Sequence, residues 1–193
     1  MGKVRFQVGE YMLAPLDDAR PAAIADFQLR NRDRFRPYSP LRTAAFYTER
    51  YWRHARSRMR RERVLGRALR WGLADGTGVV LAQVNMDHIM RGAFQSAALG
   101  YSLDESLEGR GIMTECLRRV TGYAFAELDL HRLTANHVPE NVRSAAVLAR
   151  LGFQREGLAR SYLRLNGVWR DHVLNALINP RHASLRANVS SSE

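Results

Sequence analysis

The sequence contains a single cysteine, Cys116, and this scarcity limits what the protein can be. One thiol excludes an intramolecular disulfide and a metal site built from several cysteines, and it fits a reducing compartment such as the cytoplasm. Long hydrophobic runs are also absent, so no segment is predicted to cross a bilayer. Residues 1–13 alternate polar and apolar side chains, which indicates a strand rather than a signal peptide. We expect no membrane partner, no metal and a cytoplasmic location.

The length and composition are those of an ordinary globular protein. The chain has 193 residues, of which 46% are hydrophobic and 25% are charged. This length suits one domain with a continuous core. We expect a single domain over residues 1–180, followed by a flexible serine-containing tail over residues 181–193.

Positive charge is in clear excess, with a formal net charge of +11. Such a charge attracts polyanions, including nucleic acid, ribosomes, acidic peptides and the phosphates of a nucleotide cofactor. The net charge alone does not distinguish among these partners. Much of the excess lies in residues 50–67, an arginine-rich segment with helical character. Two interpretations stay open for this segment: a solvated basic face, or a surface that contacts the ribosome or RNA.

Hydrophobic periodicity predicts a mixed α/β order of elements. Two prolines in residues 36–40 exclude a regular helix there, and Asn166-Gly167 is a strong hairpin signal. An antiparallel meander in a sheet covered by helices is the expected architecture. Strands are predicted at residues 4–13, 67–73, 79–90, 93–103, 132–137, 155–165 and 169–177, and helices at residues 19–30, 43–65, 111–128 and 141–151.

The segment 99–113 leads from a strand through a glycine-containing loop into a helix. Gly109 and Gly111 allow backbone N–H groups to turn toward an anion, and the helix N-terminus adds attraction for phosphate. Arg110 adds a mobile positive charge. The loop lacks the three-glycine spacing of a dinucleotide fingerprint and the Gly-Lys-Ser/Thr of a nucleoside triphosphate loop. In the helix that follows, Cys116 falls on the apolar face, which indicates a structural thiol rather than a nucleophile.

This strand, loop and helix, followed by Asn141-Val142-Arg143-Ser144 and by the segment 148–153, resembles the GNAT superfamily of acyl-CoA-dependent N-acetyltransferases. The segment 166–173, with Arg91-Gly92 and the segment 99–102, narrows the resemblance to the RimJ/RimL type, and most to RimJ. It extends from Val4 to about Pro180. Enzymes of this type acetylate the N-termini of ribosomal proteins, which makes acetyl-CoA the implied co-substrate.

The resemblance implies a GNAT-type α/β (α+β) fold, in which a mixed, mostly antiparallel central sheet splays open for acetyl-CoA between helices. By position, the opening lies near residues 101–103 and 133–137. Backbone groups of Tyr101 and Leu103 would bind the pantetheine arm and the acetyl carbonyl, and Asn141 would also contact this arm. The pyrophosphate would be held by backbone amides of Leu107, Glu108, Gly109, Arg110, Gly111, Ile112 and Met113.

The catalytic positions depart from part of the superfamily. Asn136 stands where a glutamate base is often found, and Leu148 stands where a tyrosine acid is often found. The Asn-x-x-Ser of RimL-like enzymes is matched by Asn141 and Ser144. We expect Ser144 to supply a proton or hydrogen bond to the departing thiolate, and a water held by Asn136 to relay the proton of the amine. Helix capping also explains Asn141 and Ser144. Loop and strand residues that remain candidates for the base are Asp87, His88, Glu105 and Glu108.

Acetylation of a protein N-terminus, with a ribosomal protein as acceptor, is the leading expectation. The resemblance implies that residues 37–40 wall the acceptor site, although a break between two helices also explains their prolines. One alternative is acetylation of a small amine, because the cofactor half of the site is shared. Another is a basic RNA-binding or ribosome-binding module with a vestigial acetyl-CoA site. The sequence leaves open the acceptor, the general base, the oligomeric state, and whether acetylation takes place on the ribosome.

Overall fold

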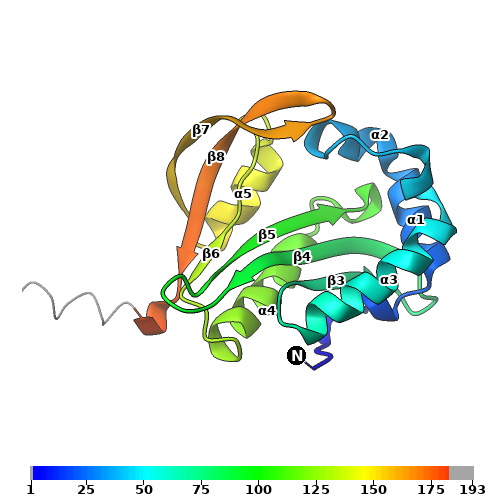
Figure 1. Cartoon of the computed structure of the whole chain (residues 1–193), viewed down its shortest axis with the longest axis horizontal. Coiled ribbons are helices and arrows are strands. Elements are labelled where there is room, and N and C mark those ends of the chain that lie inside the picture. The colour runs from blue at the N-terminus through cyan, green and yellow to red at the C-terminus, as the bar shows by residue number, and fades with distance from the viewer. Residues whose placement is uncertain (1, 183–193) are drawn as a thin grey trace, which may run out of the picture.

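A computed structural model describes residues 2–182 of the chain (Figure 1). These residues form one eight-stranded sheet in the order β1-β2-β3-β4-β5-β6-β8-β7. The strands are β1 Phe6–Val8, β2 Tyr11–Pro15, β3 Leu69–Ala74, β4 Val80–Met90, β5 Ser96–Leu103, β6 Arg132–Thr134, β7 Gln154–Leu165 and β8 Val168–Ile178. The α-helices are α1 Pro21–Arg30, α2 Arg32–Phe35, α3 Glu49–Val64, α4 Ile112–Ala126 and α5 Val142–Arg150, and short 3-10 helices are η1 Leu16–Asp18, η2 Arg36–Tyr38, η3 Ala44–Tyr47 and η4 Glu105–Leu107.

The meander and the mixed α/β class are confirmed, and two predicted elements are divided. Strands β1 to β5 pair antiparallel in chain order. The strand predicted over residues 4–13 is a hairpin, because Gly9 takes a positive φ of 57° between β1 and β2. The helix predicted over residues 43–65 is interrupted at Thr48, whose extended backbone and hydroxyl cap the N-terminus of α3. Residues 183–193 of the predicted tail lie outside the described residues.

Apolar side chains cover both faces of the sheet. One cluster joins the sheet to α4 and to Leu148 of α5, and it includes Cys116, which is fully buried. Burial raises the pKa of the Cys116 thiol to about 12, so its structural role fits the sequence interpretation. A second cluster packs α1, η3 and α3 on the opposite face, with Phe27 and Trp52 among its buried side chains.

The sheet opens between β5 and β6, its one parallel pair among residues 2–182. These strands pair at three positions only, the last of them Ala98 with Thr134. Beyond that pair β5 continues along β4 to Leu103, whereas Ala135 and His137 turn to β8 and bond with Asn175 and Val173. The predicted splay is therefore present, and β6 is shorter than the predicted strand 132–137.

The β7–β8 hairpin turns at Asn166-Gly167, as the sequence predicts, and its tip reaches the N-terminal half of the chain. Arg36 Nε donates to Asn166 Oδ1 at 3.1 Å, and the Asn166 N–H donates to the Ser39 carbonyl at 2.8 Å. Figure 1 shows this tip beside α2, on the far side of the opening from α4. The hairpin and the segment 36–40 thus form a continuous wall.

Candidate active site

The loop before α4 presents unpaired backbone N–H groups. Gly109 and Gly111 have φ values of 69° and 73°, and Gly111 is the N-cap of α4. A Cβ added at either glycine would meet no atom within 4 Å, so the space in front of the loop is open. No group in residues 2–182 accepts a hydrogen bond from the amides of residues 109–114, whereas the amides of Leu107 and Glu108 donate within the turn. Free amides at a helix N-terminus bind phosphate well.

Asp104 fixes this loop to the N-terminal helices. Its carboxylate accepts hydrogen bonds from Arg30 Nε at 2.7 Å, from Asn31 Nδ2 at 2.9 Å and from the Ser106 backbone N–H at 3.1 Å. Burial opposes ionisation of Asp104, but the hydrogen bonds from Asn31, Arg30 and Ser106 outweigh it and hold the pKa of this carboxyl well below its usual range. No local pattern in the sequence marks Asp104 as a site residue, because its partners Arg30 and Asn31 are distant in sequence.

The remaining side chains of the loop are either buried or paired with charged and polar neighbours. Leu107 and Met113 are buried in the core, so they offer only their backbone to a ligand. The Glu108 carboxylate pairs with Arg34 and with Arg143, the latter at 3.0 Å. Arg110 lies near the β1–β2 turn, where its guanidinium donates to the Tyr11 hydroxyl at 3.5 Å. The Arg110 side chain is half-exposed, and its guanidinium also lies 3.7 Å from the Glu10 carboxylate.

The structure brings together two predicted site residues across the opening of the sheet. The Tyr101 hydroxyl of β5 lies 2.7 Å from Ser144 Oγ of α5. Burial raises the pKa of Tyr101 to about 12, against the opposing effect of the hydrogen bond with Ser144, so the phenol is neutral at neutral pH. Asn141 caps α5, because its Oδ1 accepts from the Ser144 N–H at 3.1 Å. The capping role that the sequence left open for Asn141 is therefore observed.

The other candidates for proton transfer lie in different surroundings. Asn136 is half-buried, with its Oδ1 accepting from the Asn175 N–H at 3.2 Å and its Nδ2 donating to the Tyr162 hydroxyl at 3.4 Å. Glu105 and His88 are exposed, and neither lines the pocket described next. Asp87 does line it. Burial raises the pKa of the Asp87 carboxyl, with Arg70 at 2.6 Å opposing the shift.

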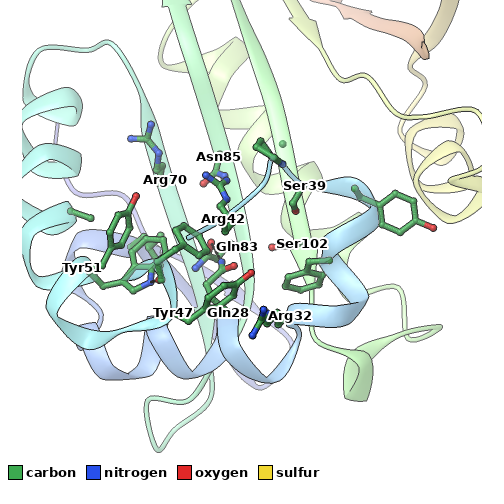
Figure 2. A pocket seen from close by; sticks show the side chains of 18 of the residues that line it. Gln28, Arg32, Ser39, Arg42, Tyr47, Tyr51, Arg70, Gln83, Asn85 and Ser102 are labelled. Carbon is green, nitrogen blue, oxygen red and sulfur yellow. Dashed lines mark hydrogen bonds between the residues drawn. The ribbon is translucent and has the colours of Figure 1, made fainter. Parts of the chain in front are cut away.

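A pocket of about 540 Å³ lies on the face of β4 and β5 that α1, α3 and the segment 36–42 cover (Figure 2). It reaches β5 at residues 100–102, beyond the last pair with β6, and therefore meets the opening in the sheet. Its floor is a row of polar side chains from β4, Gln83, Asn85 and Asp87, whereas the alternate residues of the strand pack on α4. Gln83 and Asn85 were not among the site residues predicted from the sequence. Polar residues at every second position of an otherwise apolar strand were the available signal.

Two further findings concern the described residues as a whole. No helix within residues 2–182 combines the length and the apolar character that a membrane span needs. No three histidine, cysteine, aspartate or glutamate side chains in this range converge as metal ligands do.

Comparison with known proteins places this site in a family. Residues 12–154 match the model of the acetyltransferase (GNAT) domain. The [ribosomal protein uS5]-alanine N-acetyltransferase of Escherichia coli strain K12 is 34% identical over 179 residues, which are 92% of each chain. A ribosomal-protein-S5-alanine acetyltransferase from Vibrio fischeri superimposes with a TM-score of 0.88 at 32% identity, over 92% of this chain and 97% of that one. RimJ of Mycobacterium smegmatis, in complex with CoA-disulfide, gives 0.81 at 32% identity, over 92% and 86%. With its splayed sheet and glycine loop, the chain belongs to the GNAT family and is an acetyl-CoA-dependent N-acetyltransferase of the RimJ/RimL type.

Proposed function

We propose that this enzyme transfers the acetyl group of acetyl-CoA to the N-terminal α-amine of a protein, with a ribosomal protein as the acceptor, in the cytoplasm. The observation that carries the proposal is the polar pocket that meets the opening in the sheet at residues 100–102. A pocket on one face and a phosphate loop at the end of β5 allow two substrates to meet within the opening. Two of the relatives described above, those from Escherichia coli and Vibrio fischeri, are acetyltransferases of ribosomal protein S5, which supports the choice of acceptor.

In this proposal the cofactor lies along the free edge of β5. The amides of residues 109–113 bind the pyrophosphate, since they are unpaired and face open space. Backbone groups of Tyr101 and Leu103 bind the pantetheine arm, because this end of β5 pairs only with β4. Asn141 contributes its Nδ2, because its Oδ1 is occupied by the cap of α5. Acetyl-CoA supplies the activated acetyl thioester.

Side chains near the opening in the sheet assist the two proton transfers, one from the amine and one to the thiolate. An α-amine has an unperturbed pKa of about 8, so roughly a tenth of it is neutral at pH 7 and needs no strong base. A water held at Asn136 and the neighbouring Tyr162 hydroxyl relays the proton of the attacking amine to solvent. Ser144 donates its proton to the departing thiolate and regains one from solvent, and the Tyr101 hydroxyl orients Ser144 Oγ from 2.7 Å. Ser144 is thus the proposed acid, with Tyr101 as its positioning residue.

Thiol release from acetyl-CoA, with synthetic N-terminal peptides of ribosomal proteins as acceptors, tests this function. Peptides of the same sequence with a blocked N-terminus are the matched control, and polyamines and free amino acids test the small-amine alternative. We expect turnover that requires a free α-amine. Turnover restricted to small amines would overturn the proposal, and a complete lack of turnover despite acetyl-CoA binding would favour the binding-module alternative.

We further propose that α3 docks the enzyme on the ribosome. The side of this helix that faces away from the pocket carries the exposed side chains of Arg50, Arg53, Arg60 and Arg61. Not all its arginines are free for this, since Arg63 is buried and pairs with Asp17 at 2.8 Å. A double variant, Arg60→Glu with Arg61→Glu, is expected to weaken salt-sensitive ribosome binding and to leave peptide turnover unchanged. Unchanged ribosome binding would refute this contact.

A further inference from the structure

The floor of the pocket holds hydrogen-bonding groups that the protein itself leaves unused. Gln83 is 5% exposed, and its Oε1 accepts from Gln28 Nε2 at 3.0 Å. Gln83 Nε2 and Asn85 Oδ1 are buried atoms that find no partner within residues 2–182. Unpaired buried polar atoms lower stability, and proteins keep few of them. A donor and an acceptor left unpaired on the same face of one strand, in a pocket, indicate a ligand that supplies the complementary pair.

A peptide main chain supplies this pair. In an extended chain the N–H and C=O of one residue point to the same side, as they do in a hydrogen-bonded pair of an antiparallel ladder. Gln83 and Asn85 are two residues apart in β4, so their side chains lie on the same face of the strand (Figure 2). The Cα atoms of such residues are separated by about 7 Å along the strand. Their amide groups can therefore take the place of a neighbouring strand edge.

Gly100 lies between the side chains of Gln83 and Asn85 and the opening in the sheet where acetyl transfer is proposed to take place. It lies opposite Asn85 in the β4–β5 pairing, and it comes directly after Ala98 and Leu99, where β6 departs. A Cβ added at Gly100 would meet no atom within 4 Å, so the absent side chain leaves space between the pocket and the opening. A peptide whose second residue lies over Asn85 and Gln83 can thus extend its first residue past Gly100.

We propose that Asn85 and Gln83 bind the main chain of the acceptor's second residue. Asn85 Oδ1 accepts a hydrogen bond from the N–H of that residue, and Gln83 Nε2 donates one to its C=O. This inference rests on the proposed acetylation of protein N-termini and sharpens it. The recognition is independent of the second side chain, but it requires a secondary amide after the first residue. Small amines and peptides with proline in second place lack that N–H and are poor substrates.

The test compares two acceptors that differ in one atom: a peptide with a free N-terminal alanine, and its analogue with an ester in place of the first amide. The wild-type enzyme is expected to acetylate the amide with a kcat/KM on the order of ten-fold above that of the ester. In Asn85→Leu the two substrates are expected to differ by less than about two-fold, because the partner of the N–H is gone. Gln154→Leu, an exposed amide outside the pocket, is the matched control and keeps the wild-type preference.

The outcomes separate this inference from the function on which it rests. Equal turnover of amide and ester by the wild-type enzyme overturns main-chain recognition and leaves N-terminal acetylation standing. A wild-type enzyme that acetylates no peptide refutes both. If Asn85→Leu does not fold, as judged by its acetyl-CoA binding, the wild-type comparison decides, together with a peptide whose second residue is proline, which we expect to react at least about ten-fold more slowly.

Discussion

Replacing Asp104 by asparagine is expected to loosen the acetyl-CoA loop from the N-terminal helices. Oδ2 of Asp104 accepts from Arg30 Nε and Asn31 Nδ2, and Oδ1 accepts from the Ser106 N–H and from Ser106 Oγ at 2.8 Å. An asparagine has one oxygen for these two positions. If the oxygen keeps Ser106, the amide NH₂ faces the donors of Arg30 and Asn31, and both of those hydrogen bonds are lost.

The size of the effect follows from these contacts. Hydrogen bonds to a charged group contribute about 1.5–3 kcal/mol each and neutral ones about 0.5–1.5 kcal/mol, and buried donors without partners add a penalty. Asp104 is buried, so solvent does not compensate. We expect Asp104→Asn to lower the free energy of unfolding by about 2–4 kcal/mol at pH 7, against a total of about 5–15 kcal/mol for a typical protein.

Urea denaturation at a series of pH values measures this effect and its sign. The pKa of Asp104 is lowered in the folded state, so its contribution to stability is complete above the unfolded pKa of about 3.9 and is lost as the pH falls toward the folded pKa. The difference between wild type and Asp104→Asn is therefore constant near neutral pH and shrinks below about pH 4. Acetyl-CoA binding, measured by calorimetry, should weaken in parallel, because the loop amides lose their anchor.

Asp26→Asn is the matched control for this experiment. Asp26 pairs with the same arginine, Arg30, but its side chain is 62% exposed. Exposed ion pairs contribute about 0–1 kcal/mol, so Asp26→Asn should change stability by no more than that and leave acetyl-CoA binding intact. Equal effects of the two substitutions, or a pH-independent difference down to about pH 2, would refute the reasoning about Asp104.

Three further predictions concern the site and the core. Ser144→Ala should lower kcat by about ten-fold or more while the affinity for acetyl-CoA stays within about two-fold, and a normal rate across pH would remove the acid role. Gly109→Glu should abolish measurable acetyl-CoA binding in calorimetry, because a side chain is strained at φ 69° and its charge would oppose the pyrophosphate, whereas Gly76→Glu, in an open turn, should bind normally. Cys116 should resist alkylation in the native protein and react once urea unfolds it, because the thiol is fully buried with a pKa of about 12; rapid native labelling would contradict this.

The sequence by itself determined the features that depend on neighbouring residues. The helical spacing of Met113, Cys116, Leu117 and Val120 predicted α4, and Asn166-Gly167 predicted the last hairpin. The Gly109-Arg110-Gly111 loop was located because its glycines stand directly before an apolar helix. The order of elements predicted a mixed α/β sheet covered by helices, and the resemblance implied that this sheet splays open as in GNAT enzymes.

Only the tertiary structure decided which distant residues meet. Tyr101 and Ser144 are 43 positions apart, and Arg30 and Asp104 are 74 apart. Their contacts depend on strand register and on how α1 and α5 dock, which no local period encodes. The sequence shows that Gln83 and Asn85 are polar residues at alternate positions of an apolar strand, but it does not show that they line a pocket. Alternation places these side chains on one face of β4, and only the packing of α1 and α3 over that face encloses them in a pocket beside the opening.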